Sequence, residues 1–173
     1  MTKTPVFGIT GWKNSGKTQL VTSLVGEFTA RGFKVSTVKH AHHNFDIDRP
    51  GADSYRHREA GASEVALVSG RRWALMHELR GEEEPPLDEI LSRLAPCDLI
   101  LIEGYKRENH AKIEARRTET RDRGRLAPAD PNILAVAADH AQPDETLPVF
   151  DLNDVSSMAD FIESHSGLKR PAT

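Results

Sequence analysis

The most informative stretch of the chain is Val6-Phe-Gly-Ile-Thr-Gly-Trp-Lys-Asn-Ser-Gly-Lys-Thr18. Its first five residues predict a short buried strand, and the apolar residues that follow it at helical spacing predict a helix. These residues are Leu20, Leu24, Val25 and Phe28. Between strand and helix, Gly11–Thr18 matches the pattern G-x-x-x-x-G-K-[ST], which is typical of a phosphate-binding P-loop. A plain glycine turn with a stray lysine is the alternative, and it does not account for the flanking strand and helix.

The residue types of this P-loop motif suit a nucleotide. Its glycines let successive backbone N–H groups turn toward phosphate oxygens, and the helix N-terminus adds its positive dipole. Lys17 is predicted to neutralise β- and γ-phosphate charge, and the Thr18 hydroxyl to ligate Mg²⁺. The predicted nucleotide-binding residues of the loop are Gly11, Lys13, Asn14, Ser15, Gly16, Lys17, Thr18 and Gln19.

Strands and helices are expected to alternate along the rest of the chain. We expect strands at 34–39, 65–68, 98–102, 112–115 and 133–138, helices at 53–60, 87–94 and 154–164, and a short hairpin within 71–79. Such alternation predicts an α/β three-layer P-loop NTPase fold, a mostly parallel central sheet with helices on both faces. We expect residues 1–173 to form one domain, with 167–173 as a loose tail.

A P-loop NTPase needs a second carboxylate near Mg²⁺, and the most apolar strand offers two. Ligands of open α/β sheets bind at the carboxyl ends of the strands. Asp98 begins that strand, about 16 Å from the correct end at ~3.3 Å per residue. Glu103 ends it, and Gly104 allows close approach of a γ-phosphate. Glu103 is therefore predicted to act with Lys17 in catalysis and with Thr18 at the metal, the alternative being a carboxylate that only caps the strand.

Further candidates follow the second predicted strand. Lys39 and His40 end it, so they are expected near the nucleotide, and Asp46 and Asp48 are candidates for contact with Mg²⁺. Histidines 40, 42 and 43 raise the alternative of a transition-metal site. Neighbouring side chains of an extended chain point apart, however, so solvated or phosphate-contacting histidines are favoured.

Base selectivity has one candidate residue. Asp139 directly follows the predicted buried strand 133–138, where a carboxylate can accept hydrogen bonds from a guanine edge. No N-K-x-D motif occurs, and an ordinary turn residue at the end of the strand explains Asp139 equally well.

Composition excludes several classes of protein. The 173 residues include 23 basic and 26 acidic residues, a net charge of −3, so no overall charge favours binding to nucleic acid. Apolar runs are far shorter than the ~20 residues that cross a bilayer. The single cysteine excludes an intramolecular disulfide, and a cytoplasmic protein that binds neither membranes nor nucleic acid is expected.

An ordered set of motifs resembles the molybdopterin-guanine dinucleotide biosynthesis protein B (MobB) family. These are Gly8-Ile-Thr-Gly-Trp-Lys-Asn-Ser-Gly-Lys-Thr18, Thr37-Val-Lys-His-Ala-His-His43, Asp46-Ile-Asp48, Pro50-Gly-Ala-Asp-Ser54, Ala60-Gly-Ala62, Arg72-Trp73 and Leu101-Ile-Glu-Gly-Tyr-Lys106. The resemblance implies a dimeric GTP-binding protein, with Mg²⁺ and weak GTPase activity. It implies an accessory role beside the molybdenum cofactor guanylyltransferase, with molybdopterin and apo-molybdoenzymes as further partners. Some dimeric relatives carry a lysine where this chain has Trp12, so Lys13 is not given that trans-acting role.

The sequence leaves two alternative functions open, and it does not decide whether the apolar segment 73–76 forms a dimer contact. A GTPase metallochaperone would use histidines 40–43, and a small-molecule kinase would close the arginines of 116–125 over the transferred phosphate. Trp73, Leu75 and Met76 suit a hairpin packed on its own domain and a dimer contact equally well, and the family resemblance favours the dimer. His40 is the nearest candidate general base, and no arginine finger is evident, so slow hydrolysis is expected.

Overall fold

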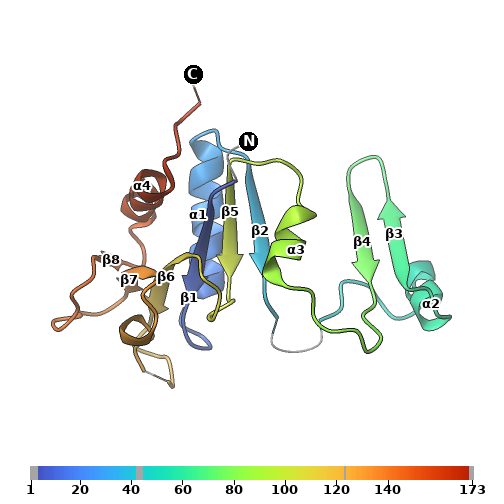
Figure 1. The fold of residues 1–173 in the computed structure, drawn as a ribbon, viewed down its shortest axis with the longest axis horizontal. Coiled ribbons are helices and arrows are strands. Elements are labelled where there is room, and N and C mark those ends of the chain that lie inside the picture. The colour runs from blue at the N-terminus through green and yellow to red at the C-terminus, as the bar shows by residue number, and fades with distance from the viewer. Residues whose placement is uncertain (1–3, 42–44, 123, 172–173) are drawn as a thin grey trace. The chain divides into compact units, whose positions relative to one another are not determined.

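The structure is a computed structural model that describes residues 4–41, 45–122 and 124–171. It divides into two compact units (Figure 1). The first unit comprises residues 1–40 and 94–173, and the second comprises residues 41–93. Each unit is described by itself below.

A six-stranded sheet forms the centre of the first unit. Its strands are β1 (Val6–Thr10), β2 (Val35–Lys39), β5 (Leu99–Glu103), β6 (Ala111–Arg116), β7 (Ile133–Ala138) and β8 (Val149–Asp151). They lie in the order β2-β5-β1-β6-β7-β8, and every neighbouring pair is parallel. All six carboxyl ends therefore share one edge of the sheet, where the P-loop motif follows β1.

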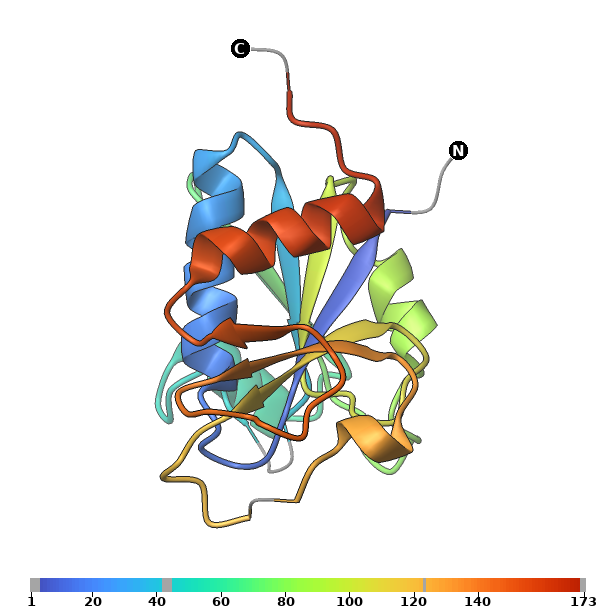
Figure 2. The ribbon, with the colours of Figure 1, turned by 90° about the vertical axis from the view of Figure 1, so that its left-hand side faces the viewer.

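Two helices of the first unit pack on its core. α1 (Lys17–Ala30) and α4 (Val155–Ser166) pack against one another and against β1 (Figure 2). The predicted spacing on α1 buries Leu20, Leu24 and Phe28, which join Phe7 and Ile9 of β1 in one apolar cluster. Asp154 caps α4 as expected of this residue type, because its carboxylate accepts a hydrogen bond from the Ser157 N–H at 3.1 Å.

The second unit is built from two short helices and a hairpin. α2 (Asp53–Glu59) packs on β3 (Glu64–Val68), which pairs antiparallel with β4 (Trp73–His77), and α3 (Leu87–Ser92) follows. The expectation of a hairpin within 71–79 is wrong, since residues 73–77 form one strand. The turn instead lies between the two strands, where the Ser69 N–H donates to the Arg72 carbonyl at 2.9 Å.

The predicted α/β class with a mostly parallel sheet is confirmed. Three details differ from the expectations: α1 begins at Lys17, inside the P-loop motif, and both β8 and the short 3₁₀ helix η1 (Ala127–Ala129) were not anticipated. Three-residue elements are too short to carry a periodic pattern. Within the described ranges, no helix is long and apolar enough to span a membrane.

Candidate functional site

The P-loop motif turns tightly between β1 and α1. Gly11, Asn14 and Gly16 have φ values of 143°, 65° and 92°, a region that favours glycine and tolerates asparagine. A Cβ at Gly11 would lie 2.6 Å from the carbonyl oxygen of Ala115 on β6, so the loop passes β6 at a distance that only glycine permits. The sequence pattern therefore forms the predicted strand–loop–helix unit.

Lys17 closes this loop on itself. Its Nζ donates to the Trp12 carbonyl at 2.6 Å. Burial and the positive charges of Lys106 and Lys39 lower the pKa of Lys17, while Glu103 acts in the opposite direction. A partly buried ammonium among other cations is a favourable position for an anion.

Thr18 and Glu103, two residues predicted to ligate Mg²⁺, are in direct contact. The Thr18 hydroxyl donates to Glu103 Oε1 at 2.7 Å, and the Glu103 side chain is 11% exposed. These hard oxygen donors fit Mg²⁺, which takes one or two protein oxygens and fills its remaining positions with water and phosphate. Asp98 lies at the opposite end of β5, where its carboxylate accepts the Lys34 N–H at 2.7 Å.

Gly104 and His40 lie directly beside Glu103. The His40 N–H donates to the Glu103 carbonyl at 3.0 Å, and the His40 ring packs on Tyr105 with centroids 4.6 Å apart. Gly104 has a φ of 95°, and a Cβ there would lie 3.3 Å from His40 Cβ. Both residues thus lie beside Glu103, at the carboxyl ends of β2 and β5.

On the other side of the P-loop motif lies a cavity of about 250 Å³. It opens among the carboxyl ends of β1, β6 and β7, and residues that line it include Trp12, Arg117, Thr120, His140 and Gln142. Sequence reasoning did not place Arg117 or Trp12 here. The arginine-rich composition of 116–125 was the available signal, but it is equally typical of a solvated loop.

Trp12 and Arg117 tie the surrounding loops to the P-loop motif. The Trp12 indole N–H donates to the Gly124 carbonyl at 2.6 Å, and Lys106 Nζ lies 4.0 Å from the centroid of the Trp12 ring. Arg117 covers Gly16, where a Cβ would lie 2.7 Å from its Nε. A cationic side chain therefore lies against the N-terminus of α1.

Asp139 directly precedes His140, which lines this cavity, and its carboxylate already accepts hydrogen bonds. Its Oδ1 accepts from the Thr118 N–H at 2.9 Å, the Thr118 hydroxyl at 3.0 Å and His140 Nδ1 at 2.8 Å. Burial would raise the pKa of Asp139, but the hydrogen bonds from His140 and Thr118 outweigh it and hold the pKa below its usual range. In this structure Asp139 fastens the turn that follows β6.

The remaining sequence candidates lie in the second unit or outside the described residues. Asp46 and Asp48 both face Arg58, at 3.1 Å and 3.7 Å from its guanidinium nitrogens, and Asp48 also accepts from the Ser54 hydroxyl. These contacts account for both carboxylates within their own unit. His42 and His43 lie outside the described residues, and the described residues contain no cluster of three or more potential metal-ligating side chains.

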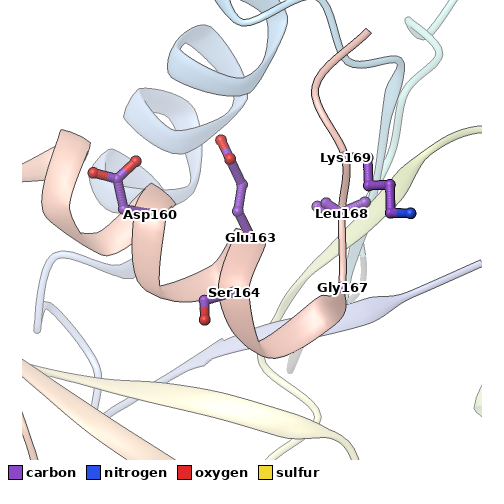
Figure 3. Close-up of a pocket in the computed structure, with 6 residues that line it drawn as sticks. All are labelled: Asp160, Glu163, Ser164, Gly167, Leu168 and Lys169. Atoms are coloured by element: carbon purple, nitrogen blue, oxygen red, sulfur yellow. The ribbon is translucent and has the colours of Figure 1, made fainter.

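A second groove, of about 430 Å³, lies where α4 ends (Figure 3). It is lined by Asp160, Glu163, Ser164, Gly167, Leu168 and Lys169. Arg31, at the C-terminus of α1, bonds both Asp160 and Glu163 at 2.6 Å. Because α1 starts at the carboxyl edge of the sheet and runs back along it, this groove lies at the end away from the P-loop motif. We assign its acidic residues to helix packing.

The fold and the loop geometry define an α/β protein with a P-loop-like fold. The family model described as "Molybdopterin guanine dinucleotide synthesis protein B" matches residues 6–139. The chain is 39% identical to the "Molybdopterin-guanine dinucleotide biosynthesis adapter protein" of Escherichia coli (strain K12), over 93% of each chain. It is 40% identical to the protein of the same description from Haemophilus influenzae, over 92% of this chain and 88% of that one.

Solved structures agree with the sequence comparisons. The MobB homologue from Bacillus stearothermophilus matches with a TM-score of 0.69 and 27% identity, over 95% of this chain and 99% of its own. The chain belongs to the MobB family of molybdopterin-guanine dinucleotide biosynthesis adapter proteins.

Proposed function

We propose that this protein binds GTP with Mg²⁺ at the P-loop motif and acts as an adapter beside the guanylyltransferase of molybdenum cofactor biosynthesis. The observation that carries the nucleotide part is the contact of Thr18, which follows Lys17 in the P-loop motif, with Glu103 on the neighbouring strand. The Thr18–Glu103 contact of 2.7 Å brings together the two oxygens that a nucleotide-bound Mg²⁺ needs. The adapter part rests on family membership.

Strand order suggests how the nucleotide lies. Glu103 and Lys39 end β5 and β2 on one side of β1, and the cavity opens at β6 and β7 on the other. The γ-phosphate and metal then belong on the β5 side, and the nucleoside belongs in the cavity. Three buried polar atoms of residues that line the cavity lack a hydrogen-bond partner among the described residues: Ser15 Oγ, Arg116 Nε and Thr120 Oγ1. Buried polar groups are usually paired, so these atoms support a bound polar ligand.

We assign base selectivity to Asp139. The residue directly precedes His140, which lines the cavity, and hydrogen bonds hold its pKa below the ordinary value, so it offers guanine N–H donors a carboxylate. Its Oδ1 already accepts from three donors, so a guanine contact falls to Oδ2 or displaces one of them.

We further propose that the protein is a homodimer joined through the hairpin of the second unit. Cross-strand pairing places Val68 opposite Trp73 and Ala66 opposite Leu75 on one face of the hairpin. Val68 is 79% exposed and Trp73 is 72% exposed, while Val65 and Met76 on the other face are buried. An exposed apolar face of this kind suits a twofold contact with a second copy.

We expect GTP hydrolysis to be slow and guanylyl transfer to be absent. His40 is the candidate base nearest the proposed metal site, and its ring packs on Tyr105. Instead, the protein changes the activity of the guanylyltransferase. Through that enzyme it changes the supply of cofactor to apo-molybdoenzymes. Direct contact with molybdopterin is part of the same proposal.

Guanylylation of molybdopterin by the purified guanylyltransferase tests the adapter role. The reaction is measured alone, with this protein and GTP, and with its Lys17→Ala variant; we expect stimulation by the native protein only. Lys34→Ala, a lysine change at the opposite end of β2, should stimulate as the native protein does. Equal rates with and without the native protein, or robust transfer by this chain alone, would contradict the adapter role.

A further inference from the structure

Lys39 lies against the same two oxygen atoms that the proposed metal ion would use. Lys39 and Glu103 are paired across β2 and β5 in the parallel register, so their side chains leave the sheet on the same face. Lys39 Nζ is 3.2 Å from Glu103 Oε1 and 3.5 Å from Thr18 Oγ1. These two oxygens are 2.7 Å apart. The ammonium and the two oxygens therefore form a compact triangle.

We propose that the Lys39 ammonium holds the divalent-cation position between Thr18 and Glu103, and is exchanged for the metal when a nucleoside triphosphate binds. This inference rests on the proposed function, because it assumes the same Mg²⁺–nucleotide site. The inference assigns to Lys39 a role in coupling the binding of Mg²⁺ to the binding of the nucleotide, beyond simple contact with phosphate.

The charge balance of the site explains why a placeholder is needed. Glu103 is largely buried, and an uncompensated carboxylate in that position is costly. Lys39 neutralises it, while Lys17 and Lys106 keep the surroundings positive. A divalent ion arriving alone would have to displace Lys39 into this cationic neighbourhood. Phosphate oxygens of a nucleotide provide the displaced ammonium with a new partner, so the metal and the nucleotide favour one another's binding.

The geometry of Lys39 suits such an exchange. Its side chain is 58% exposed, and its four-carbon stem lets the ammonium swing without movement of β2. The ammonium can therefore leave Glu103 when a divalent ion takes over the compensation of that carboxylate. Lys17 is different, because it is bonded to the loop that it belongs to. Lys39 is thus the exchangeable cation of the cluster.

The test measures Mn²⁺ binding to the nucleotide-free protein by electron paramagnetic resonance. Lys39→Met should bind Mn²⁺ about fivefold more tightly than the native protein at this site, since a competing charge is gone. The matched variant Lys34→Met, at the residue directly before the other end of β2, should show no gain. Adding Glu103→Gln to Lys39→Met should abolish the gain, which places it at this carboxylate. Lys39→Gln repeats the measurement of Mn²⁺ affinity with a polar, uncharged side chain of similar length.

A second measurement addresses the coupling. The ratio of GTP affinity in Mg²⁺ to GTP affinity in EDTA, measured by calorimetry, should fall in Lys39→Met by about the same factor, as linkage requires. Unchanged Mn²⁺ affinity in both Lys39 variants, a gain that survives Glu103→Gln, or an unchanged ratio would overturn the proposal. Native protein that binds no GTP refutes the proposed function instead, and the Mn²⁺ comparison needs no nucleotide, so the two failures are distinguishable.

Discussion

Glu103 is the residue on which the contacts of the site converge. It pairs with Thr18 and Lys39 through one carboxylate oxygen, and its charge acts against the lowering of the Lys17 pKa. Because charges this close influence one another, we expect the variants of this cluster to affect phosphate binding and metal binding to different extents.

Lys17→Ala and Thr18→Ala are expected to distinguish the binding of GTP from the contribution of Mg²⁺. Lys17→Ala should weaken GTP binding by about 100-fold, because close phosphate charge loses its partner. Thr18→Ala should mainly reduce the dependence of binding on Mg²⁺, since it removes a metal ligand. Calorimetry with GTP, with and without Mg²⁺, measures both. Unchanged GTP binding by Lys17→Ala would refute the assignment of the P-loop motif.

Asp139→Asn is expected to reduce the preference for GTP over ATP by about tenfold or more, because an amide cannot accept both donors of a guanine edge. Competition of each nucleotide against a labelled GTP analogue gives the preference. Thr118→Val is the control: it removes one hydroxyl contact to Asp139 and keeps the carboxylate. If the native protein shows no preference, guanine selectivity is wrong; if Asp139→Asn keeps the preference, only the role of Asp139 is wrong.

At the scale of elements, buried charges position the loops around the cavity. β6 alternates apolar residues, which face the core, with Lys112, Glu114 and Arg116. Glu114 accepts the N–H groups of Leu126 and Ala127 at 2.9 Å each, and Arg116 bonds Glu114 at 2.7 Å and Glu145 at 2.6 Å. The segment between β6 and η1 is thereby anchored at both ends, which positions Arg117 beside the P-loop motif.

The contact of α1 with α4 depends on a similar cluster. Arg31, whose side chain is 9% exposed, bonds Glu27, Asp160 and Glu163. Arg31→Ala should lower the free energy of unfolding by about 2 kcal/mol at pH 7, because Glu163 loses a charged hydrogen-bond partner. Denaturant unfolding measures this value, with Lys169→Ala as a control on the neighbouring segment.

The effect of Arg31 should depend on pH. Burial would raise the pKa of Glu163, but the bonds from Arg31 and Arg170 outweigh it and hold the pKa below its ordinary value. A depressed carboxyl pKa contributes stability that is present above the unfolded pKa and lost as pH falls through the folded one. The difference between the native protein and Arg31→Ala should therefore shrink below about pH 4. A difference that stays constant down to pH 2 would contradict this account.

At the scale of the whole molecule, the second unit is an insertion of residues 41–93 between β2 and β5 of the first. Every described residue that we assign to phosphate or base binding lies in the first unit. We propose that the two units work as one nucleotide-binding domain, with the insertion contributing the dimer surface.

Trp73→Glu is expected to convert the proposed dimer to monomers, because a charge would be buried in the apolar contact. Light scattering at micromolar concentration should give twice the chain mass of 19.2 kDa for the native protein and the chain mass for the variant. Phe45→Glu is the matched control, since Phe45 is 74% exposed in the same unit but lies outside the hairpin. A native protein of 19.2 kDa would refute the dimer.

Much of the fold was predictable because its signals are local. The P-loop motif, the spacing of Leu20, Leu24 and Phe28, and the apolar strand predicted at 98–102 and observed at 99–103 are all readable within a few residues. The rule that ligands bind at the carboxyl ends of strands was enough to choose Glu103 over Asp98. The hairpin was predicted in the wrong place, because residues 73–77 pair with β3 and a partner strand cannot be read from one segment.

The sequence by itself determined the α/β class, the strand–loop–helix unit of the P-loop motif and the residue types of the proposed metal site. The tertiary structure alone decided that Lys39 lies against Glu103, that Arg117 covers Gly16 and that Trp12 holds Gly124. The physical reason is range: helix and strand patterns depend on neighbours along the chain, whereas these contacts join residues 64, 101 and 112 positions apart. They follow from strand order and side-chain packing, which no local pattern specifies.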